Sequence, residues 1–128
     1  MDLNQVTVPV SDMDRAIAFY KALGLKLIVH GGNPNYARFE CPGGSTFSLH
    51  KADDLGADRD LTIYFENEKL DENVARLKAD GVTFESDPGD MPWGWREARL
   101  RDPDGNRICI YWAGMNRRYP PWRLENAD

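Results

Sequence analysis

An internal repeat constrains the fold of this chain more than any other feature. An offset of 57 residues matches the two halves at three places: Val6-Thr7-Val8 on Ile63-Tyr64-Phe65, Lys21-Ala22 on Lys78-Ala79, and Gly24-Leu25 on Gly81-Val82. Farther along the offset becomes 61, which places Pro42-Gly43-Gly44 on Pro103-Asp104-Gly105. Such self-similarity marks a repeated structural unit. The chain is therefore predicted to contain two copies of one unit, the second with an insertion around residues 90–95.

The pattern within the first copy predicts the order of its elements. Residues 3–10 alternate apolar and polar side chains, as a half-buried strand does. Ser11 is predicted to cap a helix that Gly24 closes. Three further strand-like segments follow, at residues 25–30, 35–41 and 45–51. Each copy is thus predicted to be a β-α-β-β-β unit, and the fold class to be α+β.

Length and composition narrow the class of protein. With 128 residues the chain has the length of one domain. A net charge of -5 disfavours nucleic acid as a partner, and no apolar run is long enough for a membrane helix. The first residues do not resemble a secretion signal, and the two cysteines form no disulfide framework. We therefore expect a cytoplasmic protein.

Alternation along the strands also predicts which side of each sheet a residue occupies. The helix-covered side, predicted to be the core, carries Val6, Val8, Phe39, Phe47, Leu49, Ile63, Phe65, Ala98, Leu100, Ile108 and Ile110. The opposite side carries Gln5, Thr7, Arg38, Ser48, His50, Thr62, Tyr64, Glu66, Glu97, Arg99, Cys109 and Tyr111. The second set is too polar to be a core, and its mixture of charges and aromatic rings is typical of a ligand-binding wall.

The opening Val-Thr-Val-Pro-Val-Ser-Asp-Met-Asp-Arg-Ala-Ile-Ala-Phe-Tyr and the later Pro-Trp-Gly-Trp-Arg-Glu-Ala-Arg-Leu-Arg-Asp-Pro-Asp-Gly-Asn-Arg-Ile resemble the vicinal oxygen chelate superfamily. That superfamily includes glyoxalase I, bleomycin-resistance proteins and extradiol dioxygenases. Among these, this sequence most resembles the bleomycin-resistance-like members. The resemblance implies a single domain over residues 1–116, with repeats at about 3–52 and 60–113 whose sheets form a curved cup, as in the glyoxalase/bleomycin resistance/dihydroxybiphenyl dioxygenase fold. It also implies a homodimer.

The resemblance further identifies four positions at which family members often hold a divalent metal. They are occupied here by Gln5, Ser48, Thr62 and Cys109, where the family usually has His or Gln, Glu, His and Glu. An amide, two hydroxyls and a thiol are a poor donor set for such metals. We therefore expect no metal and no other cofactor.

The leading hypothesis is a small-molecule-binding protein whose cup takes a planar or anionic organic ligand. Arginine side chains at matching positions of the two repeats, Arg38 and Arg99, would clamp an anion. Trp93 and Trp95 would stack on a planar ring, as aromatic side chains do. The ligand-binding residues are predicted to be Gln5, Arg38, Ser48, His50, Thr62, Tyr64, Trp93, Trp95, Arg99, Cys109 and Tyr111.

The sequence is also compatible with other hypotheses about function. A metal-dependent lyase, isomerase or dioxygenase would need its ligands moved to His50, Glu66 and Glu97. A metal-free enzyme would use Glu66 or Glu97 as its base, and an interaction module would have its cup filled by its own side chains. The same two glutamates could instead pair with Arg38 or Arg99. The sequence identifies neither the ligand nor a reaction.

The C-terminal segment has no counterpart in the first repeat. Residues 117–128 include Tyr119-Pro120-Pro121-Trp122, in which two prolines prevent regular structure. Exposed aromatic side chains are unfavourable in water, so we expect this tail to dock on its own domain or on a partner subunit.

Overall fold

The structure is a computed structural model that describes residues 3–56 and 59–125. It divides into two compact units. Unit 1 comprises Met1–Asp60 together with Asp102–Asn106, and unit 2 comprises Leu61–Arg101 and Arg107–Asp128. Among the described residues, neither helix has the length and apolar character needed to cross a lipid bilayer.

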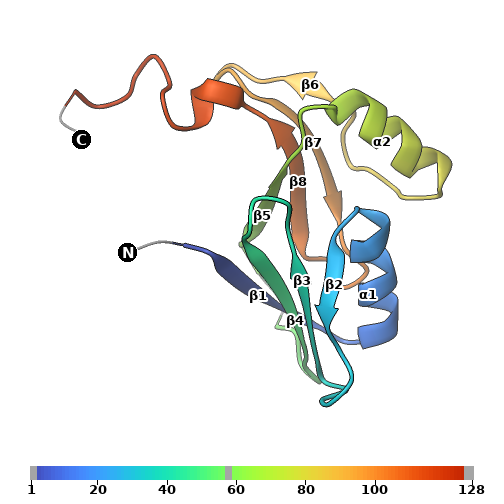
Figure 1. The fold of residues 1–128 in the computed structure, drawn as a ribbon. Helices are drawn as coiled ribbons and strands as arrows, with labels where there is room; N and C mark the ends of the chain where they lie inside the picture. Colours follow the sequence, from blue (N-terminus) through green and yellow to red (C-terminus); the bar gives the residue numbers. More distant parts are fainter. Residues whose placement is uncertain (1–2, 57–58, 126–128) are drawn as a thin grey trace. The chain divides into compact units, whose positions relative to one another are not determined.

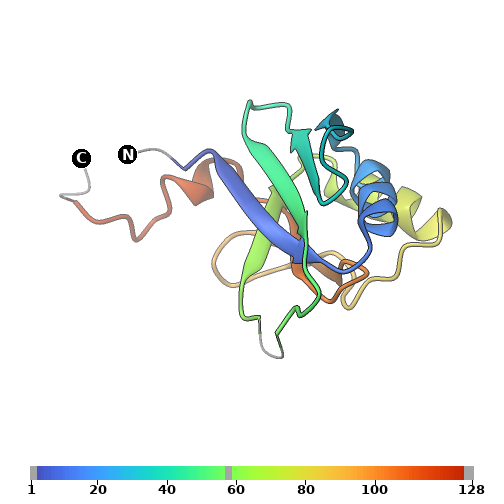
Figure 2. The ribbon, with the colours of Figure 1, turned by 90° about the horizontal axis from the view of Figure 1, so that it is seen from below.

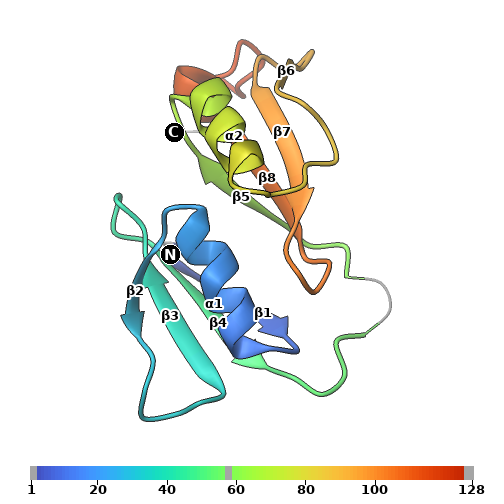
Figure 3. The ribbon, with the colours of Figure 1, turned by 90° about the vertical axis from the view of Figure 1, so that its right-hand side faces the viewer.

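Unit 1 is one mixed sheet with one helix. Its elements are β1 (Gln5–Val10), α1 (Met13–Ala22), β2 (Lys26–Val29), β3 (Tyr36–Glu40) and β4 (Thr46–Lys51). The strand order is β1-β4-β3-β2; β1 pairs with β4 in parallel and the other pairs are antiparallel. Figure 1 labels these elements, Figure 2 shows β1 running beside β4, and Figure 3 shows α1 lying across one side of the sheet.

Unit 2 repeats this arrangement. Its elements are β5 (Thr62–Glu66), α2 (Leu70–Ala79), β6 (Gly89–Asp90), β7 (Arg96–Arg101), β8 (Arg107–Trp112) and a short 3-10 helix η1 (Gly114–Arg117). The strand order is β5-β8-β7-β6, with β5 parallel to β8. The predicted α+β class and the two β-α-β-β-β repeats are confirmed. The strand ends differ from the predicted ones by one or two residues.

The start of α1 differs from the prediction. Asp12, not Ser11, is the N-cap: its carboxylate accepts the backbone N–H of Arg15 at 3.0 Å. The Ser11 hydroxyl instead donates to the carboxylate of Asp104. Both residue types can cap a helix, so their order in the sequence does not decide between them. Gly24 follows the helix with φ of 99°, the left-handed conformation that a closing glycine adopts.

The helix-covered side of each sheet forms a core. In unit 1, Tyr20 of α1 packs against Phe39 and Phe47, with ring centroids 6.0 and 4.7 Å away. In unit 2, Leu70, Val74 and Leu77 of α2 are buried above Ala98, Leu100, Ile108 and Ile110. The predicted core residues are buried except for Val6, Ile63 and Phe65, which are half-buried.

The turn between β7 and β8 belongs to unit 1. Asp102 is buried, and its carboxylate accepts hydrogen bonds from the Tyr20 hydroxyl and the Asn106 amide, both at 2.6 Å. The backbone N–H groups of Asp104 and Asn106 add two more, both at 2.9 Å. The Asn106 amide also donates to the carbonyl of Pro9 at 3.0 Å. The turn is therefore tied to both α1 and β1.

Candidate functional site

The helix-free side of the unit 1 sheet carries a polar cluster, which we call the Tyr36 cluster: Gln5, Tyr36, Arg38, Thr46 and Ser48. These residues share one side because Gln5 faces Thr46 and Arg38 faces Ser48 in the strand register. The Tyr36 hydroxyl lies 2.9 Å from the Ser48 hydroxyl and accepts the Nε–H of Arg38 at 2.8 Å. The Gln5 carbonyl oxygen accepts the Thr46 hydroxyl at 2.8 Å.

These contacts act on the ionisation of Tyr36. The hydrogen bond with Ser48 contributes most, and Arg38 and Gln5 add to it; together they outweigh the opposing effect of burial and hold the pKa of Tyr36 below its usual value. Ser48 is fully buried, whereas Tyr36 and Arg38 are half-buried. The phenol oxygen is thus fixed by the sheet while the ring keeps contact with solvent.

The two histidines lie at the edge of this cluster. His50 is exposed and faces Tyr36 across the β3–β4 ladder. His30 is exposed, and its Nδ1 lies 3.0 Å from the backbone oxygen of Tyr36.

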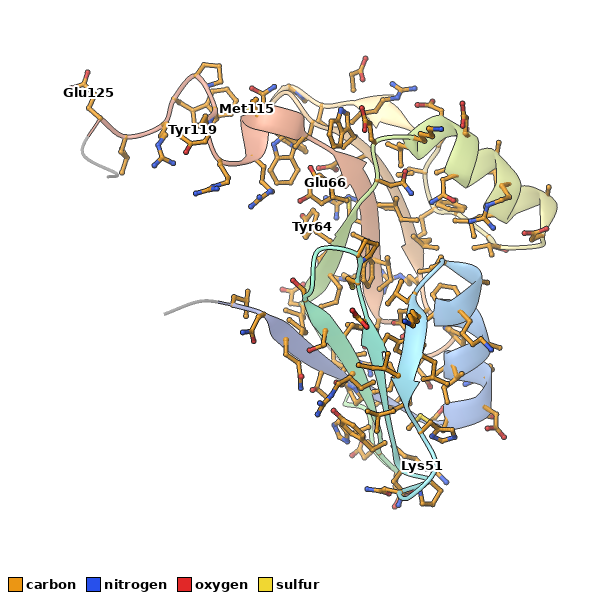
Figure 4. The ribbon with its side chains drawn as sticks, viewed as in Figure 1. Lys51, Tyr64, Glu66, Met115, Tyr119 and Glu125 are labelled. Atoms are coloured by element: carbon orange, nitrogen blue, oxygen red, sulfur yellow. The ribbon has the colours of Figure 1, made fainter. Side chains whose placement is uncertain are left out.

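The helix-free side of the unit 2 sheet carries an aromatic cluster made of Tyr64, Trp95 and Tyr111. The rings of Trp95 and Tyr111 stack with centroids 4.7 Å apart, and Tyr64 meets both edge-on at 6.0 and 5.6 Å. Tyr64 keeps an exposed fraction of 45%, while Tyr111 keeps 6%. Figure 4 labels Tyr64 and Glu66 along β5. The cluster therefore offers one accessible ring on a buried aromatic base.

A buried carboxylate lies beside these rings. Glu97 is 2% exposed; it accepts the indole N–H of Trp93 at 3.0 Å and pairs with the Arg99 guanidinium at 3.2 Å. Arg99 also donates to the Tyr64 hydroxyl at 3.4 Å, and its guanidinium lies 5.8 Å from the centre of that ring. The sequence is compatible with Glu97 as a free base or as the partner of an arginine. In the structure Glu97 is paired with Arg99.

Glu66 lies on β5 and Glu97 on β7, the two strands that flank β8. In the strand register Tyr111 stands opposite both glutamates, because β8 runs between β5 and β7. The Glu66 carboxylate accepts the backbone N–H of Ala113 at 3.3 Å. The register therefore separates the two carboxylates by a strand.

Burial changes the chemistry of Cys109. Its side chain is fully buried beneath the aromatic cluster, with Tyr111, Ala113 and Trp95 as neighbours. Removal from water, with a smaller effect from Glu97, raises the pKa of the Cys109 thiol to about 12. The thiol is therefore protonated at neutral pH, which makes it a weak nucleophile and a weak metal ligand.

Unit 2 has a pocket of about 270 Å³ whose lining includes Arg99, the residue that also contacts Tyr64. Its charged and hydroxyl-bearing lining consists of Glu85, Ser86, Arg99, Arg101 and Arg107. Arg101 pairs with Glu85 at 3.1 Å, and the Ser86 hydroxyl accepts the backbone N–H of Arg99 at 2.9 Å. The pocket therefore brings three arginines together with Glu85, and one of the three, Arg99, also pairs with Glu97 outside the lining.

The residues at the family's metal positions do not fit a metal. In unit 1 the Gln5 carbonyl oxygen accepts the Thr46 hydroxyl at 2.8 Å, and Ser48 is hydrogen-bonded to Tyr36. In unit 2, Thr62 is a hydroxyl donor and Cys109 is a buried, protonated thiol. Within residues 3–56 and 59–125, no three His, Cys, Asp or Glu side chains lie together in a way that could hold an ion.

The polar sides of the sheets are more buried than the sequence indicates. The predicted ligand-binding wall includes Ser48, Glu97, Cys109 and Tyr111, yet all four are buried. In unit 2 the cause is Trp95, which lies over Tyr111. The predicted ligand-binding residues do not include Tyr36, Arg101 and Arg107, although alternation from Arg38, Arg99 and Cys109 places them on the same sides.

Comparison with known proteins identifies the family. The family model "Glyoxalase/Bleomycin resistance protein/Dioxygenase superfamily" matches residues 2–110. The uncharacterized protein YraH of Bacillus subtilis is 29% identical over 126 residues, covering 87% of this chain and 98% of its own.

Solved structures share the same fold. A glyoxalase/bleomycin resistance protein/dioxygenase from Nocardioides has a TM-score of 0.76 at 23% identity, over 97% of this chain and 89% of its own. A superfamily member from Sphaerobacter thermophilus has a TM-score of 0.72 at 29% identity, over 88% of this chain and 97% of its own. The repeated units, the sheet topology and the match over most of its length together show that this chain belongs to the Glyoxalase/Bleomycin resistance protein/Dioxygenase superfamily.

Proposed function

We propose that this member of the superfamily binds a small, planar, anionic organic molecule on the helix-free side of the unit 2 sheet, without a metal. The observation that carries the proposal is the position of Arg99. Its guanidinium contacts Tyr64 of the aromatic cluster, and Arg99 is also one of the residues that line the arginine-containing pocket. One side chain thus joins an aromatic surface to the pocket.

The aromatic cluster supports the planar part of the ligand. Tyr64 is 45% exposed and is held edge-on against Trp95 and Tyr111. A fixed aromatic ring binds a planar molecule at a low cost in side-chain entropy, because two torsions are already restricted. Trp93, 41% exposed and bonded to Glu97, supplies a second ring within unit 2.

The pocket supports the anionic part. Guanidinium groups recognise carboxylate, sulfonate or phosphate oxygens through paired N–H donors. Arg99, Arg101 and Arg107 come from adjacent strands, since Arg101 faces Arg107 and Arg99 faces Cys109 in the β7–β8 register. Arg101 pairs with Glu85 and Arg99 with Glu97, and each guanidinium carries five N–H donors with which a ligand anion can interact.

The test uses anilinonaphthalene sulfonate, an anion with a planar naphthalene ring whose fluorescence rises on binding. We expect saturable binding to the wild type and about tenfold weaker binding to Arg107→Met, since a charge-assisted contact contributes about 1.5–3 kcal/mol and 1.4 kcal/mol is tenfold. Titration of the fluorescence against dye concentration measures both affinities. Benzoate should compete with the dye.

Arg76→Met is the matched control. Arg76 lies on α2 and pairs with Asp80 on the helix-covered side, so its loss changes the net charge equally without touching the pocket. If dye binding weakens equally in both variants, the net charge of the protein and not the pocket determines the affinity, and the proposal fails. Dye binding that does not saturate would also contradict it.

We propose in addition that two copies of the chain associate through the segment after β8. This segment carries the exposed apolar side chains Met115, Trp122 and Leu124, at 72%, 60% and 78% exposure. Figure 4 labels Met115 and Tyr119 along it. Apolar groups gathered in this way favour burial against a partner.

Sedimentation measures this association. We expect the wild type to sediment as a dimer and the variant Met115→Ser/Trp122→Ser as a monomer at the same concentration. Leu3→Ser removes a side chain that is 82% exposed outside this segment and should leave the dimer intact. A monomeric wild type would refute the proposed association.

A further inference from the structure

We propose that the ligand of the unit 2 site is an aromatic acid whose carboxylate is bonded directly to the ring, as it is in benzoate. This inference rests on the proposed function and names the class of molecule that the same site would take. It is carried by the short, fixed spacing between the ring of Tyr64 and the guanidinium of Arg99.

The guanidinium of Arg99 lies at the hydroxyl end of the Tyr64 ring. Its Nη2 is 3.4 Å from the Tyr64 hydroxyl oxygen, while its central carbon is 5.8 Å from the centre of the ring. The strand register explains this closeness, because Tyr64 on β5 and Arg99 on β7 both stand opposite Cys109 of β8. The cation is therefore adjacent to a group that is bonded directly to an aromatic ring.

Both side chains are held in place by other residues of unit 2. Tyr64 contacts the stacked rings of Trp95 and Tyr111, with centroids 6.0 and 5.6 Å away. Arg99 pairs at 3.2 Å with Glu97, which is 2% exposed. A ligand would have to break these contacts to change the distance between the ring and the cation. The spacing is thus a property of the folded unit.

Hydrogen-bond donors remain at this end of the ring. The Nη2 of Arg99 makes the hydrogen bonds to both Tyr64 and Glu97. Within residues 3–56 and 59–125, no hydrogen bond engages Nε or Nη1 of Arg99 or uses the O–H of Tyr64 as a donor. The Arg99 side chain is 40% exposed, so a ligand can reach these groups. Guanidinium N–H groups and a phenol O–H suit the two oxygens of a carboxylate.

The spacing selects among aromatic acids by the length of the link between ring and carboxylate. A planar ring that stacks on Tyr64, which is 45% exposed, brings a directly bonded carboxylate to the level of the Tyr64 hydroxyl and of Arg99. A link of two methylene groups would move the carboxylate away from these donors or the ring away from Tyr64. Its rotatable bonds would also have to be fixed on binding, which costs entropy. The site therefore favours an aryl carboxylate over an arylalkyl carboxylate.

The test measures displacement of anilinonaphthalene sulfonate by benzoate, phenylacetate and 3-phenylpropionate. Hydrophobic contact alone would make the affinity rise about fourfold with each added methylene group. We expect the opposite order, with benzoate binding about tenfold more tightly than 3-phenylpropionate, because the longer acid loses a charge-assisted contact. Affinities that are equal or that rise with chain length would overturn the inference.

The variant Tyr64→Phe removes the hydroxyl and keeps the ring, so dye binding reports that the variant is folded. Benzoate should bind it about tenfold more weakly than it binds the wild type, whereas the affinity for 3-phenylpropionate should change by less than about twofold. The control Tyr119→Phe removes a hydroxyl from a side chain of similar exposure, 48% against 45%, and should leave both affinities unchanged. Equal losses for the two acids in Tyr64→Phe would contradict selection by length.

The dye titration distinguishes a wrong ligand class from a wrong site. Saturable dye binding that weakens in Arg107→Met, together with affinities that rise with the length of the acid, would retain the proposed site and overturn the aryl carboxylate as its ligand. Dye binding that does not saturate would contradict the site itself, and the choice of ligand would fall with it.

Discussion

Replacement of Asp102 by asparagine should lower the free energy of unfolding by about 3–5 kcal/mol, because several buried donors would lose their acceptor. The carboxylate of Asp102 accepts four hydrogen bonds and donates none. An amide of the same shape would turn an N–H₂ group toward donors from Tyr20 or Asn106. Urea unfolding followed by circular dichroism measures the change.

Two variants calibrate this result. Tyr20→Phe removes one of the four donors and leaves Asp102 with three, so it should cost about 1–1.5 kcal/mol. Asp87→Asn alters a carboxylate whose side chain is 81% exposed and should stay within about 0.5 kcal/mol of the wild type. A stability of Asp102→Asn equal to that of Asp87→Asn would show that the turn does not support unit 1.

Removal of the Arg99 charge should be the second large effect. Arg99→Met leaves the buried carboxylate of Glu97 with the indole N–H of Trp93 as its remaining described side-chain donor. Loss of one partner of a buried ion pair costs about 3–5 kcal/mol, and we expect about 2–3 kcal/mol here because the Arg99 side chain is 40% exposed and water replaces part of the contact.

The double variant Glu97→Gln/Arg99→Met separates charge from packing. Removing the buried charge as well should restore most of the lost stability, since the amide can still accept from Trp93. Urea unfolding of the two single variants and the double variant gives the coupling energy. Additive effects of the two substitutions would mean that Glu97 and Arg99 do not interact. The double variant also gives a folded background in which to measure dye binding without Arg99.

The elements of both units could be predicted because their signals are local. Alternation along residues 3–10 gave β1, and the offset between Gly24 and Gly81 gave the matching ends of the two helices. The sides of the strands followed from the same alternation. Family membership followed from motifs that include the Asp102 to Asn106 turn.

The state of the site could not be predicted in the same way. Whether Cys109 and Glu97 are buried depends on where the loop before β7 places Trp95 and Trp93, and loop conformation has no periodic signal. The position of Tyr36 could be predicted from the sequence, because the offset of 61 that relates Arg38 to Arg99 also relates Tyr36 to Glu97. Its hydrogen bonds with Arg38 and Ser48 depend on the pairing of β3 with β4, which alternation within one strand does not show.

The assignment of residues 102–106 to unit 1 has a consequence for how the chain can be divided. A fragment ending at residue 60 would contain every strand and the helix of unit 1, yet it would lack the partner of the Tyr20 hydroxyl and of the Pro9 carbonyl. During synthesis the first half must likewise wait for the last third of the polypeptide before its own hydrogen bonds are complete. The two repeats are similar in form, but the first is not a self-sufficient module.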